Sequence, residues 1–366
     1  MFGDKENVIL GPASIYMAAL MLVNGSATET RNQLLRALKI DEKLSNDAVN
    51  KALNDCFMEE FYRDNEEENA AKLVCANKVL VSVKYPISKK YLELLQERFK
   101  STSQIVDFES KAIEISQQVN EFVSQTTNGK ISKVCEPDDF SSDTVIFLMN
   151  AVYFKGFWRY QFSPDKTIES NFHRINDAPK KIQMMHSDRQ IRMEAKDDDP
   201  DFSAIQMDFR DSQMSMILIL PKRSDGLMEL QKRLFHEPDS IKAFRNAISN
   251  FHTFLVDIML PKFKLESELD VKNVFQTMGV VDAFSRSADL SLMHQDEAKA
   301  LYVSQMKHKA FLKIDEYGAE AAAYTACNIC PMSLPPSMEF KADHPFLVVL
   351  LSSKNEPLFI GQVLDP

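Results

Sequence analysis

The chain contains few glycines, and the glycine-dependent catalytic motifs are missing. Only 9 of the 366 residues are glycine, and none belongs to a Gly-x-Ser-x-Gly elbow or a phosphate-binding glycine loop. The His-Glu-x-x-His motif of metalloproteases does not occur either. These absences argue against the common hydrolases, nucleotide-binding enzymes and metalloproteases. We therefore expect no enzymatic activity, no cofactor and no metal site.

Cysteine is also scarce, with five residues in the whole chain. An odd number leaves at least one thiol unpaired, which favours a reducing compartment. Cys327 and Cys330 form a Cys-x-x-Cys motif, but Pro331 follows where a redox motif needs a helix, so thiol chemistry remains only an alternative. The opening residues, MFGDKE, do not look like a signal peptide, so we expect a cytoplasmic protein. The Asn24-Gly25-Ser26 sequon leaves an extracellular, secreted protein as the alternative.

Basic charge and long apolar runs are limited as well. The chain has 43 Lys and Arg residues against 53 Asp and Glu residues, a net charge of −10. This balance argues against nucleic acid or a heparin-type polyanion as partner. Apolar runs such as residues 15–23 are far shorter than the roughly 18 residues that a membrane span needs, so no membrane partner is expected. No linker is evident, and we expect one domain over residues 1–366 and a monomer.

Residues 315–336, DEYGAEAAAYTACNICPMSLPP, have a composition that suits no ordinary helix. The AEAAA run favours a helix by propensity, but it starts at a glycine, lacks an apolar face and leads into a proline-rich segment. Taken as a strand, it places Ala319, Ala321 and Ala323 on one small, buriable side, while the other side tolerates water. The prolines then hold residues 329–336 extended. The segment therefore predicts a potential strand that leads into an exposed, protease-accessible tip.

This stretch closely resembles the reactive loop of the serpin family. Glu316-Tyr317-Gly318 matches the hinge of that loop, and residues 319–323 match its insertable part. In serpins the residue that the protease attacks lies fourteen positions after the hinge glycine. The resemblance therefore implies a scissile bond between Met332 and Ser333. The similarity extends from about residue 7 to residue 366.

Two motifs outside the loop strengthen the resemblance. Residues 145–158, VIFLMNAVYFKGFW, resemble the serpin motif NxxxFKGxW, with Asn150 and Trp158 in register. The segment NVILGPASI resembles NxxFSPxSI, with Ser14 matched but Gly11 in place of the first serine. The long helix that precedes this segment in serpins is not seen in the six residues before Asn7, so it is replaced, lost or missing from the chain as given.

The resemblance also implies two polar contacts in the folded protein. His308 matches the serpin sheet-opening histidine, which implies a buried polar cluster with Ser14 and Asn150 beneath two strands that must part. Lys262 matches the lysine that pairs with the hinge glutamate, here Glu316.

The implied fold is α+β, with a large central β-sheet, smaller sheets, about eight to nine helices and a reactive-centre loop at about residues 316–336. The implied function is suicide-substrate inhibition of a serine protease. The loop would be cleaved and inserted beside the strand that carries Asn150, leaving a covalent 1:1 complex. Met332 is long, unbranched and apolar, and suits chymotrypsin-like or elastase-like primary pockets. Small side chains at residues 319–323 favour an inhibitor over the alternative, a non-inhibitory member with a chaperone, storage or interaction role.

Local patterns predict the other elements. Apolar and alternating runs predict strands at residues 7–10, 73–83, 145–155, 203–208 and 214–220 and from residue 251, and helices at residues 15–23, 28–38, 88–100, 112–123 and 271–278. We expect Thr28 and Ser88 to cap the helices that they begin. The acidic runs at residues 64–69 and 197–201 are interpreted as loops.

Overall fold

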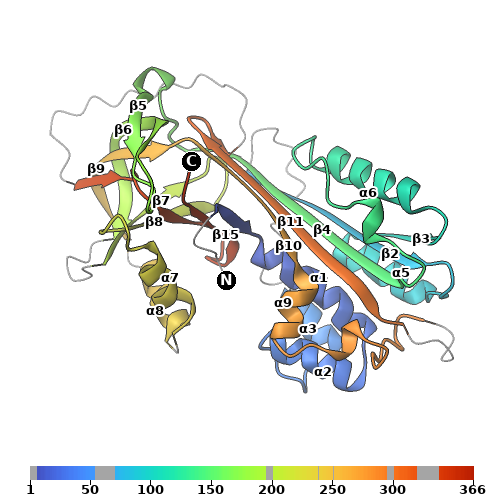
Figure 1. The fold of residues 1–366 in the computed structure, drawn as a ribbon. Coiled ribbons are helices and arrows are strands. Elements are labelled where there is room, and N and C mark those ends of the chain that lie inside the picture. Colours follow the sequence, from blue (N-terminus) through green and yellow to red (C-terminus); the bar gives the residue numbers. More distant parts are fainter. Residues whose placement is uncertain are drawn as a thin grey trace.

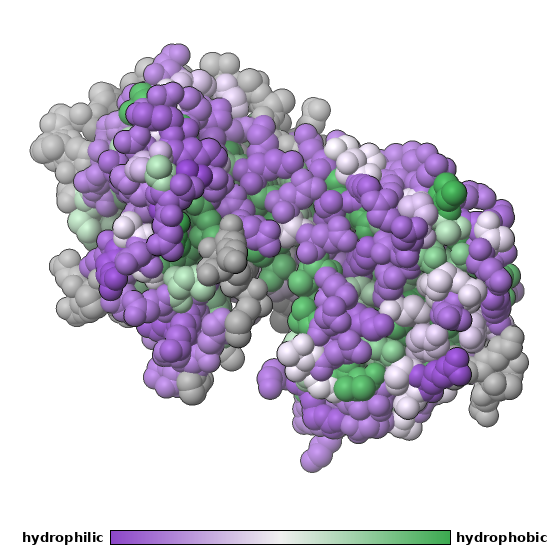
Figure 2. Space-filling model, viewed as in Figure 1, coloured by the Kyte–Doolittle hydropathy of each residue, from purple (hydrophilic) through white to green (hydrophobic). Residues whose placement is uncertain are grey.

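The computed structural model describes residues 6–53, 71–194, 201–237, 239–249, 251–294, 301–319 and 338–366 (Figure 1). Within these residues the chain forms eight α-helices and two β-sheets, one of six strands and one of nine. The predicted α+β fold is therefore confirmed. Hydrophilic residues cover most of the face seen in Figure 2, with smaller hydrophobic patches visible between them.

The six-stranded sheet has the strand order β10-β11-β12-β4-β2-β3. Its strands are β2 (Lys72–Ser82), β3 (Thr102–Val106), β4 (Ile146–Phe157), β10 (Phe263–Asp270), β11 (Val303–Asp315) and β12 (Gly318–Ala319). The apolar run in β4 was predicted to form a strand buried on both faces, and nearly every residue of β4 is buried. Strands β4 and β11 run parallel and pair directly with each other over most of their length.

Helices cover both faces of this sheet (Figure 1). The helices are α1 (Pro12–Gly25), α2 (Thr28–Ala37), α3 (Asn46–Leu53), α5 (Lys89–Phe99) and α9 (Val271–Thr277) on one side, and α6 (Ala112–Thr126) on the other. Helix α1 is apolar around most of its circumference, because it is enclosed by the main core. Helix α6 buries Ile115, Val119 and Val123 against the opposite face of β4, where Met149 and Tyr153 lie.

The nine-stranded sheet joins the remaining strands. Its order is β1 (Val8–Leu10), β15 (Pro357–Val363), β14 (Phe346–Leu351), β8 (Ser215–Pro221), β7 (Phe202–Asp208), β6 (Lys180–Glu194), β9 (Phe251–Pro261) and β13 (Met338–Lys341), and β5 (Ile168–Phe172) also pairs with β6. The smaller sheets that we expected are thus joined by hydrogen bonds into one. Helices α7 (Leu227–Phe235) and α8 (Ser240–Ala247) pack on β8 and β14 through a separate apolar cluster. Short 3-10 helices occur at Pro137–Asp139, Pro164–Lys166 and Asp282–Phe284.

The predicted helix caps are wrong in part. Thr28 is the first residue of α2 and Ala27 is its N-cap, so the Thr28 hydroxyl instead donates to Asp289 Oδ2 at 2.7 Å. Ser88 does occupy the N-cap position of α5, but its side chain makes no capping hydrogen bond. The acidic run at residues 64–69 and most of residues 197–201 lie outside the described residues. No helix in the described part of the chain is long and apolar enough to cross a membrane.

Candidate sheet-opening site and loop hinge

The hinge glycine and the first insertable residue of the loop lie between the strands that the expected mechanism would separate. Gly318 and Ala319 form β12, which pairs antiparallel with the end of β11 and also with the end of β4. Ala319 is fully buried, in agreement with the small, buriable side predicted for it. Directly beyond β12, strands β4 and β11 pair with each other from Tyr153 and Phe311 onward. We call this line of β4–β11 pairing the seam.

The conformation of Gly318 explains why glycine occupies the hinge. Its φ angle is +140°, in the region that favours glycine. A Cβ atom added there would lie 2.2 Å from the carbonyl oxygen of Gly156 and 2.8 Å from the amide nitrogen of Trp158. The backbone can therefore turn from β11 into the seam only if this residue has no side chain.

The side chain of Glu316 holds the turn that connects β11 to β12. Its carboxylate accepts hydrogen bonds from Thr167 Oγ1 at 2.8 Å and from Lys262 Nζ at 3.1 Å. The Glu316 side chain is only 7% exposed, whereas that of Lys262 is 39% exposed. Burial raises the pKa of Glu316, but hydrogen bonds from its own backbone, from Thr167 and from Lys262, together with the Lys262 charge, leave the pKa below its usual value. The carboxylate is thus ionised, and the contact expected from the sequence is present.

Trp158 fastens the end of β4 to the same turn. Its indole Nε1 donates to the carbonyl oxygen of Asp315 at 3.1 Å, and its backbone N–H donates to that of Tyr317 at 2.9 Å. The ring is buried and stacks on Phe209, with the ring centroids 4.7 Å apart. The hinge is therefore held by both side-chain and backbone contacts at the mouth of the seam.

A buried polar cluster crosses the seam three residues beyond its start, where Asn150 lies opposite His308. His308 and Asn150 are register partners on β11 and β4, and Asn77 pairs with Asn150 from β2. The oxygen Oδ1 of Asn150 accepts from the Ser14 hydroxyl of α1 and lies 2.6 Å from His308 Nδ1. Its amide nitrogen donates to Asn77 Oδ1 and lies 3.3 Å from the sulfur of Cys75. The structure therefore brings Ser14, Asn150 and His308 together.

The hydrogen bonds of His308 define its protonation state. The backbone N–H of Gly11 donates to Nε2 at 3.1 Å, so Nε2 must accept and Nδ1 must carry the proton that points at Asn150. Complete burial lowers the pKa of His308 to about 3. At neutral pH the ring is therefore uncharged, and both of its nitrogens are satisfied.

Gly11, where serpins usually carry a serine, fits this arrangement closely. A Cβ atom at Gly11 would lie 2.8 Å from Val152 Cγ1 and 3.2 Å from His308 Cε1. The absence of a side chain lets the backbone N–H approach the imidazole directly. The main chain of Gly11 therefore supplies the donor to the imidazole at a position with no room for a Cβ atom unless Val152 or His308 shifts.

The reactive bond itself is not part of the described structure. Met332, Ser333, Ala321 and Ala323 lie outside the described residues, as do Cys327 and Cys330. Of the five cysteines, the structure describes Cys75 and Cys135, and both are free. Burial raises the pKa of each thiol to about 12, so neither is ionised near neutral pH.

Comparison with known proteins decides the family. The family described as Serpin (serine protease inhibitor) matches residues 3–366. The chain belongs to the serpin family. This serpin is 30% identical to human Serpin B4 over 374 residues, which cover 99% of the chain and 94% of the relative.

Solved structures agree with the fold. The serpin superposes on Serpin48, a highly specific serpin of the insect Tenebrio molitor, with a TM-score of 0.83 and 26% identity, covering 99% of this chain and 92% of the other. It also superposes on human thyroxine-binding globulin complexed with thyroxine, with a TM-score of 0.86 and 23% identity, covering 99% of this chain and 92% of the other. At 23% identity, the similarity to thyroxine-binding globulin supports the fold only.

Sequence reasoning missed Asn77 and Thr167. Asn77 is a polar residue inside the apolar run of β2, which is the same signal that drew attention to Asn150. Thr167 gave no such signal, because it lies in a short connection after Pro164–Lys166 and meets Glu316 only in the folded chain.

Proposed function

We propose that this serpin is a suicide-substrate inhibitor of serine proteases. In this mechanism a protease attacks the carbonyl of Met332 and forms an acyl bond as the Met332-Ser333 bond breaks. The freed loop then enters the seam before water releases the enzyme. The observation that carries the proposal is the position of β12, which is already hydrogen-bonded between β4 and β11 at the mouth of the seam.

The register of β12 sets where each later loop residue would come to lie. Ala319 faces Gly156 on β4 and Ile314 on β11. Continuing both antiparallel pairings by six residues would place Thr325 between Asn150 and His308, the two residues that bond across the seam. A threonine hydroxyl can donate and accept, so it could replace the contact that insertion breaks.

The same register revises one expectation about the loop. The side chains that alternate with Ala319 were expected to face water, yet the corresponding face of β4 is covered by α6. Tyr324 would come to lie opposite Ala151, beneath that helix. Insertion would therefore require α6 to yield or to accommodate a tyrosine, a step that the sequence pattern alone does not suggest.

The target that we propose is a protease with an apolar primary pocket, of the chymotrypsin-like or elastase-like class, bound in a covalent 1:1 complex by the monomer. The support is the identity of Met332, an unbranched apolar side chain. We further propose a cytoplasmic location, since Cys75 and Cys135 are free thiols. The comparisons do not support the extracellular alternative.

The test is incubation of the serpin with chymotrypsin, neutrophil-type elastase and trypsin, followed by denaturing gels and sequencing of the released peptide. We expect a denaturant-resistant complex with chymotrypsin or elastase and a peptide that begins at Ser333. Cleavage that begins elsewhere would show that the assigned reactive bond is wrong. Cleavage at Ser333 with release of active protease would identify a non-inhibitory member and overturn the proposed function.

A further inference from the structure

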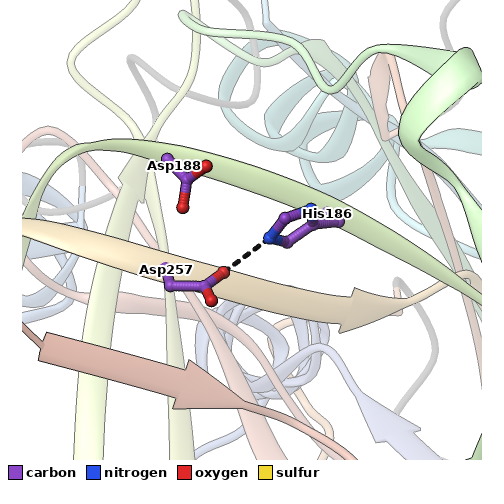
Figure 3. A group of neighbouring side chains, drawn as sticks. All are labelled: His186, Asp188 and Asp257. Atoms are coloured by element: carbon purple, nitrogen blue, oxygen red, sulfur yellow. Dashed lines mark hydrogen bonds and ion pairs between the residues drawn. The ribbon is translucent and has the colours of Figure 1, made fainter. Parts of the chain in front are cut away.

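A second group of chemically active side chains lies on the nine-stranded sheet, away from the seam. His186 and Asp188 project from β6 and Asp257 projects from the neighbouring β9 (Figure 3). Each residue offers one ligand atom, and these three atoms lie within 4.8 Å of one another. His186 Nε2 and Asp257 Oδ1 are 2.7 Å apart. An imidazole nitrogen and two carboxylates thus converge from two adjacent strands.

The pairing of β6 with β9 makes this group electrostatically unfavourable when it stands alone. Asp188 and Asp257 are direct register partners, so their side chains lie on one face of the sheet, and like charges in such positions destabilise a strand pair. The side chain of Asp188 has no hydrogen-bond or ion-pair partner among the described residues. Glu339, the partner of Asp257 on β13, extends the row of carboxylates by one strand.

Among the described residues, no neighbouring Lys or Arg side chain forms an ion pair with this row of carboxylates. Lys341 lies two residues beyond Glu339 on β13, but its ammonium is 3.5 Å from Asp343. The row therefore combines three carboxylates with the single imidazole of His186. The negative charge of these carboxylates therefore exceeds the positive charge that the neighbouring side chains provide.

We propose that His186, Asp188 and Asp257 bind a divalent cation of the zinc class. One imidazole nitrogen with carboxylate oxygens suits Zn²⁺, whereas Ca²⁺ and Mg²⁺ favour sets made only of oxygen atoms. Three protein ligands leave a fourth tetrahedral position for water. The bound metal takes the place of the direct contact between His186 Nε2 and Asp257 Oδ1, and a metal-bound imidazole is in its neutral form.

The geometry allows this with side-chain movement alone. Tetrahedral ligands at zinc distances lie about 3.3 Å from one another. His186 Nε2 and Asp257 Oδ1 would separate slightly from 2.7 Å, and any pair near the 4.8 Å limit would approach by about 1.5 Å. The side chains of His186 and Asp257 are 32% and 35% exposed, and therefore have room to rotate.

The site would stabilise the part of the sheet that receives the chain after the reactive loop. Strand β13 follows that loop and pairs with β9 over only four residues at the edge of the sheet. A cation that fixes β9 to β6 strengthens the strand on which β13 depends. This inference does not rest on protease inhibition, so the two proposals can fail separately.

The test measures binding of Zn²⁺ to the whole chain by equilibrium dialysis, and of Co²⁺ by its visible absorption spectrum. We expect one saturable site, weaker binding of Ca²⁺ and Mg²⁺, and a loss of affinity of about tenfold or more in each of His186→Ala, Asp188→Asn and Asp257→Asn. His252→Ala is the matched control, because His252 is an exposed histidine on β9 whose register position gives it the opposite face. Circular dichroism checks that each variant is folded.

Three results would overturn the proposal. One is unchanged Zn²⁺ affinity in Asp257→Asn, and another is an equal loss in His252→Ala. The third is a strong near-ultraviolet charge-transfer band with Co²⁺, because that band indicates ligation by the cysteine thiolates instead. A rise of the melting temperature with Zn²⁺ in the unmutated chain, absent in Asp257→Asn, would support a structural role.

Discussion

Acidification should destabilise the folded serpin through His308. Its pKa is about 3 in the folded chain because of burial, against an ordinary value of 6.5. Between these two values the unfolded chain binds a proton at this residue that the folded chain does not bind. Stability is therefore complete above about pH 6.5 and falls as the pH drops towards the folded pKa, by about 1.4 kcal/mol per pH unit.

The size of the effect follows from the same two values. Lowering the pH from about 7 to about 4.5 should cost about 2.5 kcal/mol of unfolding free energy through His308 alone. For a chain of 366 residues this corresponds to a fall in melting temperature of about 3 °C. Protonation would occur at Nε2, where it would break the hydrogen bond from the Gly11 backbone N–H and leave a buried positive charge beside the seam, so the seam should open more readily and polymers should form at low pH.

The measurement is a thermal unfolding series across this pH range, with His308→Gln as the comparison. Glutamine offers a donor and an acceptor but does not titrate, so its melting temperature should fall less than that of the unmutated chain. Carboxylates elsewhere titrate in both proteins and cancel in the difference. Equal losses in the two proteins would refute the assignment of the effect to His308. His252→Gln, at an exposed position, should behave like the unmutated chain.

Three substitutions test the hinge and the reactive bond. Met332→Arg should redirect inhibition from chymotrypsin-like to trypsin-like enzymes, because the primary pocket of trypsin is acidic. The measurement is the rate of inhibition of both enzymes. Unchanged specificity would contradict the assigned bond. Glu316→Lys should remove the ionic contact with Lys262, place two positive charges together and promote loop–sheet polymers, seen as ladders on native gels after mild warming. A monomeric mutant with unchanged inhibition would count against that role. Ala319→Arg should force a cation into a fully buried position at a cost of several kcal/mol, which should prevent insertion of the loop. The protease should still cut the loop of this variant but should then be released in active form. Cleavage should also no longer raise the melting temperature of the variant. Ala319→Ser is its control, and complex formation by the arginine variant would oppose the insertion mechanism.

Local sequence patterns predicted much of the sheet that carries the site. The apolar run around Asn150 became β4, and the alternating run from residue 73 became β2. Strands buried on both faces leave an unbroken apolar signal, which is easily recognised. The contact between Lys262 and Glu316 could be anticipated only through the family resemblance, because 54 residues separate the two in sequence.

Other features depend on how distant segments meet. Asn77 joins the polar cluster because β2 pairs with β4 in a particular register, and no local pattern determines that register. Thr28 has the right side chain for a helix cap, yet the backbone starts the helix one residue earlier and its hydroxyl finds Asp289. The covering of β4 by α6 likewise follows from tertiary packing.

The seam combines strongly apolar strands with one polar crossing, and this combination would suit the controlled opening that the proposed mechanism requires. The buried groups of Asn150 and His308 are satisfied by each other and by Ser14 and Gly11. A strand that entered with an apolar residue at this register would leave polar groups unpaired, at about 1–3 kcal/mol each. Thr325 avoids that cost only if β12 continues in its present register, since a shift by one residue would turn its side chain towards α6. The polar crossing would therefore select the correct register of the inserted strand as well as hold the closed sheet together.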